Sequence, residues 1–223
     1  MIGVKELIKS YCPKIDWDKK AKEKSKALGI SKDQLLKEWE EARDKGLNKG
    51  KILHDSKSKD YINEPSYIKY KYDHNGGDVP DIDCIVKEGF IYDEKMFVHP
   101  KYPLKGIPDR IKVNKGKIYI EDFKSDKAIY KVAKMFKNGK FFTKQKMLPP
   151  IGHLDYCNYI EYVLQLSLYM RLVMDNNKTL RFGGLSILHT KFDEDTLEPL
   201  SEEVIEVPYL RKEVEALLKT LKK

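Results

Sequence analysis

The chain has 223 residues, of which 41% are hydrophobic and 35% are charged, with 43 Lys and Arg against 35 Asp and Glu and a formal net charge of +8. This composition excludes an intrinsically disordered chain, and the length allows one large domain whose core needs no disulfides. The positive charge suits a polyanionic partner, although many proteins without such a partner are equally basic.

The cysteines and the apolar runs limit which cross-links, metal sites and cellular compartments are expected. The three cysteines, Cys12, Cys84 and Cys157, are scattered and form no CxxC pair. This argues against a disulfide framework and against a closed zinc site, and it favours a reducing compartment. The first apolar run is too short for a signal peptide, and no stretch approaches the ~20 apolar residues of a membrane span. We therefore expect a soluble, cytoplasmic protein with no membrane partner.

The first part of the chain is predicted to be helical. Residues 4–45 carry apolar side chains at helical spacing among Lys and Glu. Gly46 and Gly50 interrupt this pattern, and a second helix is expected over 50–62. Residues 64–89 are rich in Asn, Gly, Pro and Asp, which predicts loop or irregular structure.

The rest of the chain alternates between strand and helix patterns. Short strands are expected over 90–98, 106–113 and 117–123, with a tight turn at 114–116 that uses Gly116. A lysine-spaced stretch (124–146), a buried apolar helix (155–175), strands at 182–190 and 202–208 and an amphipathic helix (208–221) follow. This order predicts an α/β domain with a central mixed β-sheet flanked by helices and a helical N-terminal arm.

The predicted hairpin carries acidic residues on both strands. Asp109 stands on the first strand, Asp122 near the end of the second, and Lys124 two residues later. Because side chains alternate along a strand, Asp122 and Lys124 share a face, whereas Glu121 points to the other face unless the register shifts by one residue. Two converging carboxylates make an oxygen site for a hard divalent cation, and a lysine beside them can supply charge or handle a proton. A solvated strand edge is the ordinary alternative for such a pattern.

Four short segments add to this hairpin pattern. In chain order they are GKILH (50–54), PD (108–109), DFK (122–124) and QLSLY (165–169). Together they resemble the PD-(D/E)XK nuclease superfamily, specifically its RecB-like and phage-exonuclease branch. That branch shows G-x-x-x-H on a helix, then an aspartate, then D/E-x-K, then Q-x-x-x-Y on the following helix. The resemblance spans about 46–190.

The resemblance implies a metal-dependent site. His54, Asp109, Asp122 and the backbone carbonyl of Phe123 would hold a Mg²⁺ or Mn²⁺ ion. Lys124 would orient or deprotonate the attacking water, or stabilise the phosphate in the transition state.

Two residues on the following helix would support that site. Gln165 and Tyr169 are four residues apart, so both can point into one cleft. A glutamine in an apolar helix needs a polar partner. Simple core packing accounts equally well for Tyr169. Whether Glu121 or Glu94 also binds the metal is left open.

The resemblance also implies an organisation. A restriction-endonuclease-like nuclease core would span 46–223, including the C-terminal strand and helix, with the helical arm at 1–45. Relatives that carry an iron–sulfur cluster use four cysteines, so this chain, with its three scattered cysteines, is expected to hold no cluster. It also lacks the GxxxxGK[ST] phosphate-binding loop, so no nucleotide cofactor is expected.

A lysine-rich stretch is predicted to contact DNA. Its lysines alternate with aromatic residues, so the lysines can contact phosphates without reading sequence while the aromatic rings stack on exposed bases. A solvated helix face would explain the same pattern. The lysines assigned to DNA binding are Lys127, Lys131, Lys134, Lys137, Lys140 and Lys144.

Taken together, the sequence predicts a metal-dependent deoxyribonuclease. The resemblance favours an exonuclease that acts on linear DNA ends in phage-type recombination or replication, in the host cytoplasm if a phage encodes it. A structure-specific or nicking endonuclease would use the same residues. The alternative from another class is a catalytically silent DNA-binding or helicase-partner module.

DNA and a helicase or recombination protein are the expected partners, and a homo-oligomer is compatible with the pattern. Polarity and strand preference do not follow from the sequence.

Overall fold

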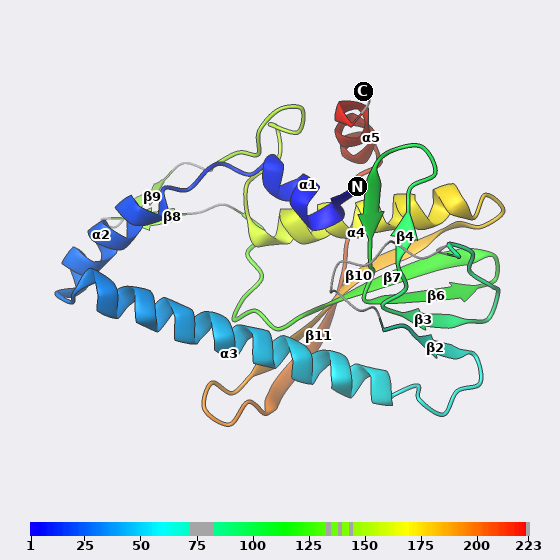
Figure 1. Cartoon of the computed structure of the whole chain (residues 1–223), viewed down its shortest axis with the longest axis horizontal. Coiled ribbons are helices and arrows are strands. Elements are labelled where there is room, and N and C mark those ends of the chain that lie inside the picture. The colour runs from blue at the N-terminus through cyan, green and yellow to red at the C-terminus, as the bar shows by residue number, and fades with distance from the viewer. Residues whose placement is uncertain (72–82, 133–134, 138–139, 143–144, 222–223) are drawn as a thin grey trace.

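A computed structural model gives the architecture of the protein (Figure 1). The structure describes residues 1–71, 83–132, 135–137, 140–142 and 145–221. The predicted class is confirmed, because a mixed β-sheet is flanked by helices and preceded by a helical N-terminal region. Within the described ranges, every helix is too short or too polar to cross a membrane.

The N-terminal region contains α1 (Val4–Ser10), α2 (Trp17–Leu28) and α3 (Lys32–Lys59). Ser31 caps α3, because its side chain accepts a hydrogen bond from the backbone N–H of Gln34. The expected break in this region is wrong, since α3 continues through Gly46 and Gly50. A helical glycine costs only about 1 kcal/mol relative to alanine, which the rest of a 28-residue helix offsets. The domain boundary placed after residue 45 therefore falls inside one helix, and the division into two domains stays a prediction.

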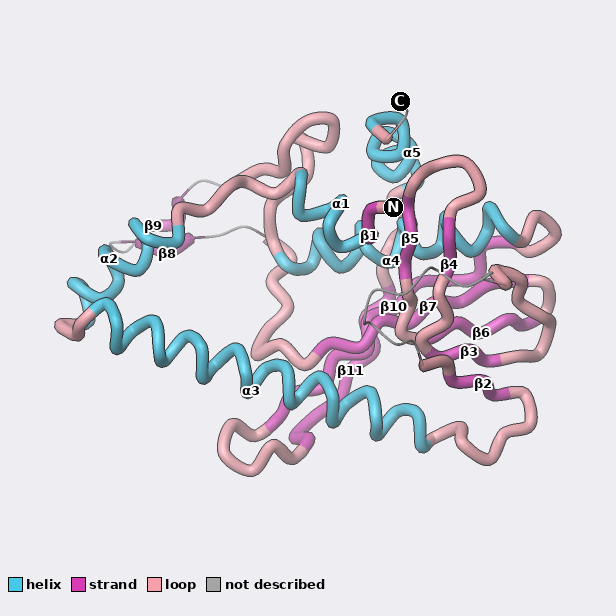
Figure 2. The backbone as a smooth tube through the Cα atoms, in the orientation of Figure 1, coloured by secondary structure: helices cyan, strands magenta, loops and turns pink. Residues whose placement is uncertain are grey.

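Six strands form the central sheet, in the spatial order β11-β10-β7-β6-β3-β2 (Figure 2). Their bounds are β2 (Tyr67–Lys69), β3 (Ile91–Asp93), β6 (Arg110–Asn114), β7 (Lys117–Lys124), β10 (Arg181–Phe192) and β11 (Pro199–Glu206). β7 runs antiparallel to β6 and parallel to β10, which makes the sheet mixed. The predicted tight turn joins β6 to β7, with Gly116 at φ 69°.

Two of the predicted strands are each split between sheets. A second sheet holds β1 (Ile2–Gly3), β5 (Leu104–Gly106) and β4 (Phe97–Val98), and β8 (Met135–Lys137) pairs with β9 (Lys140–Phe142). The segment 90–98 divides into β3 and β4 because Glu94 adopts φ 58°, a left-handed conformation that turns the chain. The segment 106–113 divides into β5 and β6 around Pro108, which lacks the backbone N–H that a strand ladder needs.

The core lies between the sheet and α4 (Asn158–Asn176), which crosses over from β7 to the parallel strand β10. The buried side of α1 and the C-terminal helix α5 (Arg211–Thr220) join the same core. On the opposite face of the sheet, Leu53 of α3 packs against Phe123 of β7 and against Leu188 and Phe192 of β10. The end of β7 is therefore held between α4 on one side and α3 on the other.

Gly106 sits where β5 approaches α4. A methyl group at this position would lie 2.7 Å from Cε1 of Tyr169 and 2.9 Å from Cδ1 of Leu172. We expect Gly106→Ala to lower the free energy of unfolding by about 1–3 kcal/mol, because the added atom forces both side chains to move. Urea unfolding measures this change. Gly46→Ala is the matched control, since nothing lies within 4 Å of its added methyl group and an alanine favours the helix. Equal stabilities for the two variants would contradict the prediction.

Candidate active site

The carboxylate of Asp122 lies at the centre of the candidate site. β7 directs it toward α4, where it is fully buried. Its Oδ1 accepts a hydrogen bond from Nε2 of Gln165 at 2.8 Å, and its Oδ2 forms an ion pair with Nζ of Lys124. Burial raises the pKa of Asp122 to about 6, against the opposing effect of the Lys124 charge. The carboxylate is thus held by the amide of Gln165 on one side and by the charge of Lys124 on the other.

Lys124 is held as a largely buried cation. Its side chain is 11% exposed, and its Nζ lies 4.6 Å from the centre of the Tyr162 ring, within the range of a cation–π contact. Burial lowers the pKa of Lys124, but the charges of Asp122 and Asp109 outweigh burial, and the pKa is raised overall. Lys124 therefore stays protonated at neutral pH, which suits the orientation of a nucleophile or the stabilisation of negative charge better than deprotonation.

Asp109 brings a second carboxylate to the same place. It lies in the connection between β5 and β6, directly after Pro108. Its Oδ2 accepts a hydrogen bond from the backbone N–H of Phe123 at 2.7 Å, which ties it to β7 between Asp122 and Lys124. The backbone of the strand that carries the D-x-K residues thus also positions the aspartate of the neighbouring connection.

α3 delivers His54 to the opposite side of Asp109. Its Nε2 lies 3.7 Å from Oδ2 of Asp109, and its Nδ1 lies 3.4 Å from Oε1 of Glu94. Its ring packs edge-on against Phe123, with the ring centres 5.3 Å apart. Burial lowers the pKa of His54, but Glu94 and Asp109 more than offset this effect and raise it. Glu94, left open by the sequence, therefore borders the site.

Gln165 and Tyr169 form a chain of contacts behind Asp122. Nε2 of Gln165 donates to Asp122 and lies 3.3 Å from the hydroxyl oxygen of Tyr169. Burial raises the pKa of Tyr169, so its hydroxyl remains protonated. Tyr169 also packs in the main core, so its core position and its contact with Gln165 coexist.

The register of β7 separates Glu121 from this group. Glu121 pairs with Arg110 across the hairpin, and its Oε2 lies 3.5 Å from Nζ of Lys112. The D-x-K residues and Glu121 therefore point to opposite faces of the sheet, as the alternation of side chains predicts.

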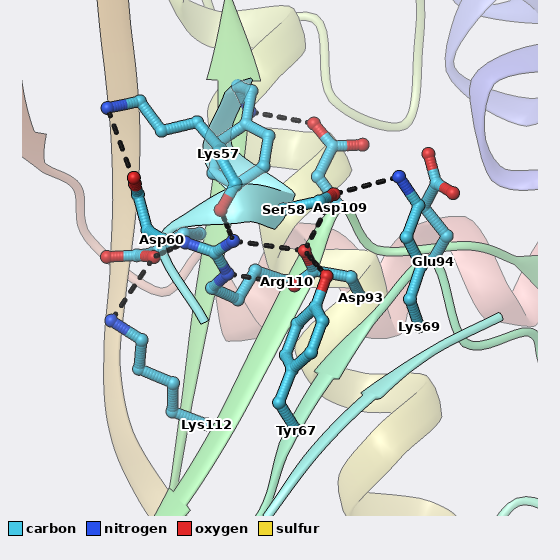
Figure 3. Close-up of polar contacts among 12 residues, drawn as sticks. Lys57, Ser58, Asp60, Tyr67, Lys69, Asp93, Glu94, Asp109, Arg110 and Lys112 are labelled. Carbon is cyan, nitrogen blue, oxygen red and sulfur yellow. Dashed lines mark hydrogen bonds and ion pairs between the residues drawn. The ribbon is translucent and has the colours of Figure 1, made fainter. Parts of the chain in front are cut away.

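A buried ion pair lies beside Asp109 (Figure 3). Arg110 donates to both carboxylate oxygens of Asp93, from Nε at 2.8 Å and from Nη2 at 3.0 Å. Nη2 also donates to the carbonyl of Lys57 on α3, and Tyr67 donates to Asp93 at 2.8 Å. This network joins α3 to the sheet within a few residues of His54. Sequence reasoning missed it, because a pairing of two charges 17 residues apart has no local signal.

The donor set has the chemistry of a site for a hard divalent cation, which prefers oxygen ligands. Oδ2 of Asp122 is buried and accepts no hydrogen bond of normal geometry from the described residues, although it faces Lys124. His54 contacts both Asp109 and Glu94, and the charge of Asp109 acts on Asp122. As the side chains lie, however, no group of three or more His, Cys, Asp or Glu among the described residues is already arranged to hold a metal ion.

Four of the six lysines predicted to bind DNA lie within the described residues. Lys127 is 80% exposed with its Nζ 3.4 Å from Glu194, and Lys131 lies over the ring of Tyr159 at 5.6 Å. Lys137 and Lys140 are opposite each other in the β8–β9 hairpin. Lys134 and Lys144 lie outside the described residues. The stretch after β7 begins as a loop and not as a helix.

The N-terminal helix adds residues that the sequence did not single out. A cavity of about 230 Å³ opens beside Lys124, between α1 and α4, and it is lined by Lys5, Lys9, Tyr162 and Gln165 among others. The charge of Lys5 reaches Asp122 and lowers the pKa of that carboxyl, against the larger effect of burial. Spacing could have pointed to Tyr162, which stands three residues before Gln165 on the same helix.

Comparison with known proteins adds little to this geometry. No protein-family model matches the chain, and no curated protein matches it. A crystal structure of a candidate exonuclease from Eubacterium rectale is similar over 57% of this chain and 41% of that one, with 20% identity and a TM-score of 0.33. The chain thus spans less than half of that protein, and likeness at this level carries no functional argument.

Proposed function

We propose that the protein is a metal-dependent nuclease that hydrolyses DNA phosphodiester bonds. The observation that supports this most is the buried unit formed by Asp122, Lys124 and Gln165 beside Asp109. A carboxylate and an ammonium group buried together at the end of a strand are expensive to desolvate, and such groups gather at functional sites. Stability alone does not favour this arrangement.

The proposed cofactor is Mg²⁺ or Mn²⁺. Asp109, Asp122, His54 and the carbonyl of Phe123 would hold it, and Glu94, whose Oε1 lies 3.4 Å from Nδ1 of His54, would be the next candidate ligand. When bound, such an ion supplies a Lewis acid for the phosphate and lowers the pKa of water. No iron–sulfur cluster and no nucleotide cofactor are part of the proposal.

Residues of the chain would stabilise the transition state and hold the carboxylates in place. Lys124, held as an ammonium group, would place its charge next to the phosphate, where negative charge grows in the transition state. Gln165, braced by Tyr169, would keep Asp122 from rotating. His54 and Glu94 would fix the far side of Asp109. Preorganised groups of this kind do not have to reorient during the reaction.

The test is degradation of end-labelled linear duplex by the purified protein in Mg²⁺, Mn²⁺ or EDTA. We expect loss of substrate with either metal and none in EDTA. Asp122→Asn is the matched variant, because an amide oxygen can still accept from Gln165 while the charge is lost. We expect its rate to fall by about 10²-fold or more. Equal rates for the variant and the wild type would reject the assignment.

We propose, on the motif resemblance alone, that the nuclease is an exonuclease that acts on linear DNA ends in phage-type recombination or replication. Covalently closed circular DNA separates it from an endonuclease. An exonuclease leaves such circles intact because they have no ends, whereas a nicking enzyme converts them to open circles. A helicase or recombination partner and a homo-oligomer are proposed from the same resemblance.

A further inference from the structure

The chain has two tryptophans, and the structure brings them together far from the candidate site. Trp17 begins α2 and Trp39 lies on α3, with their ring centres 6.0 Å apart in an edge-to-face contact. Trp17 is 58% exposed. Its cluster with Trp39 therefore forms part of the surface of the α2–α3 pair, which extends away from the central sheet (Figure 1).

Lysines cover this aromatic cluster. Nζ of Lys20 lies 4.9 Å from the Trp17 ring, and Nζ of Lys24 lies 5.6 Å from the Trp39 ring. α2 as a whole carries five lysines against two acidic residues. One of those two, Asp18, is paired with both Lys22 and Lys32. The exposed surface of α2 is therefore positively charged, which complements a polyanion and not an apolar or basic partner.

α3 sets the distance between this cluster and the candidate site. Fifteen residues separate Trp39 from His54 on one helix. At 1.5 Å per residue the separation is about 22 Å, the length of six to seven base pairs of B-form DNA at about 3.4 Å each. At 3.6 residues per turn, the two side chains project from α3 within about 60° of each other. A duplex that leaves the candidate site along this side of α3 would thus reach the tryptophans.

We propose that α2 and the Trp17–Trp39 pair form a second duplex-binding surface, which contacts the DNA backbone six to seven base pairs from the cleaved bond. Lys20 and Lys24 would bind phosphates, and the indole groups would pack against the sugar–phosphate chain. This inference takes its partner from the proposed function and extends it. α3 would act as a spacer of fixed length between the surface that holds the duplex and the site that cuts it.

The experiment uses the natural tryptophans as the probe. Duplex stems closed by a non-nucleotide linker are titrated into the full chain in EDTA, and both tryptophan emission and the anisotropy of the labelled DNA are recorded. We expect saturating stems much longer than about seven base pairs to change the emission, and stems shorter than about six to bind without changing it.

The matched variants carry the same change of charge. Lys20→Ala with Lys24→Ala should weaken binding to long stems and lower the slope of log affinity against log salt concentration by about 1.8, because two phosphate contacts are lost. Lys212→Ala with Lys219→Ala, on α5, removes the same charge from exposed positions and should leave the slope unchanged.

The inference is overturned if long stems bind without changing the emission, or if the α2 variant leaves the salt slope unaltered. It is also overturned if the emission changes with protein concentration in the absence of DNA, because the surface would then bind a second copy of the protein. Cleavage of the same stems in Mg²⁺ separates this inference from the proposed function. A protein that cuts DNA without the emission change refutes the second surface alone. A protein that shows the change but cuts under no metal refutes the nuclease alone.

Discussion

Lys124→Met is expected to lower the rate of DNA hydrolysis by about 10²- to 10⁴-fold while leaving DNA affinity within a few-fold of the wild type. Methionine keeps an unbranched, apolar side chain of similar bulk but removes the ammonium group that faces Asp122. That group would act on charge that appears only in the transition state, so its loss affects the rate far more than binding. Single-turnover cleavage and anisotropy with the same labelled duplex measure the two quantities.

The control for this variant is Lys112→Met. Lys112 is a lysine of the neighbouring strand β6, but its Nζ lies 3.5 Å from Glu121, on the other face of the sheet. Its loss should leave the rate unchanged. Lys124→Met also leaves Asp122 buried without its cation, so the double variant with Asp122→Asn shows whether a loss of folding contributes. A Lys124→Met protein as active as the wild type would exclude a role for this lysine in the chemistry.

Asp93→Ala is expected to be the most destabilising single change considered, with a loss of about 3–5 kcal/mol in the free energy of unfolding. The substitution is costly because it leaves the buried Arg110 without the carboxylate of Asp93. Arg110 is buried, and two of its hydrogen bonds end on Asp93 (Figure 3). Without that carboxylate a guanidinium charge stays in the interior, stacked between Tyr61 and Phe123. For a chain of this size, the loss corresponds to a fall in Tm of roughly 6–20 °C.

The matched control removes an aspartate from an exposed pair. Asp44→Ala breaks the contact of Asp44 with Arg43 at 3.1 Å, where both side chains are more than half exposed. Water and salt screen such pairs, so no measurable change in stability is expected. The double change Arg110→Met with Asp93→Leu should recover most of the loss, because it leaves no buried charge. Equal urea midpoints for Asp93→Ala and Asp44→Ala would show that the buried pair contributes nothing.

The parts of the fold that sequence predicted are those with local signals. The turn at 114–116 was predicted from a glycine that can adopt positive φ, and the helix over 155–175 from a long apolar pattern. The face shared by Asp122 and Lys124 follows from strand alternation alone. In contrast, Gly46 and Gly50 misled the prediction, because a single glycine weakens a helix without ending it when the flanking residues keep their hydrogen bonds.

The parts that sequence did not predict depend on contacts between distant segments. Glu94 reaches His54 only because β3 pairs with β6 and the chain then turns at a left-handed residue. Lys5 stands near Asp122 only because α1 packs against α4. No periodicity in the chain encodes either approach. The motifs therefore indicated which residues belong to the site, while the packing of α1, α3 and α4 decides which further side chains join them.

The strand β11 has a consequence for solubility. It ends the six-stranded sheet among the described strands, and Leu200 and Val204 on it are largely exposed. An apolar edge strand is a template on which another chain can add by backbone pairing, the first step of aggregation. Glu202, Glu203 and Glu206 lie along the same strand. The acidic residues along this strand would repel the same edge of a second copy, so β11 carries its own protection against self-assembly.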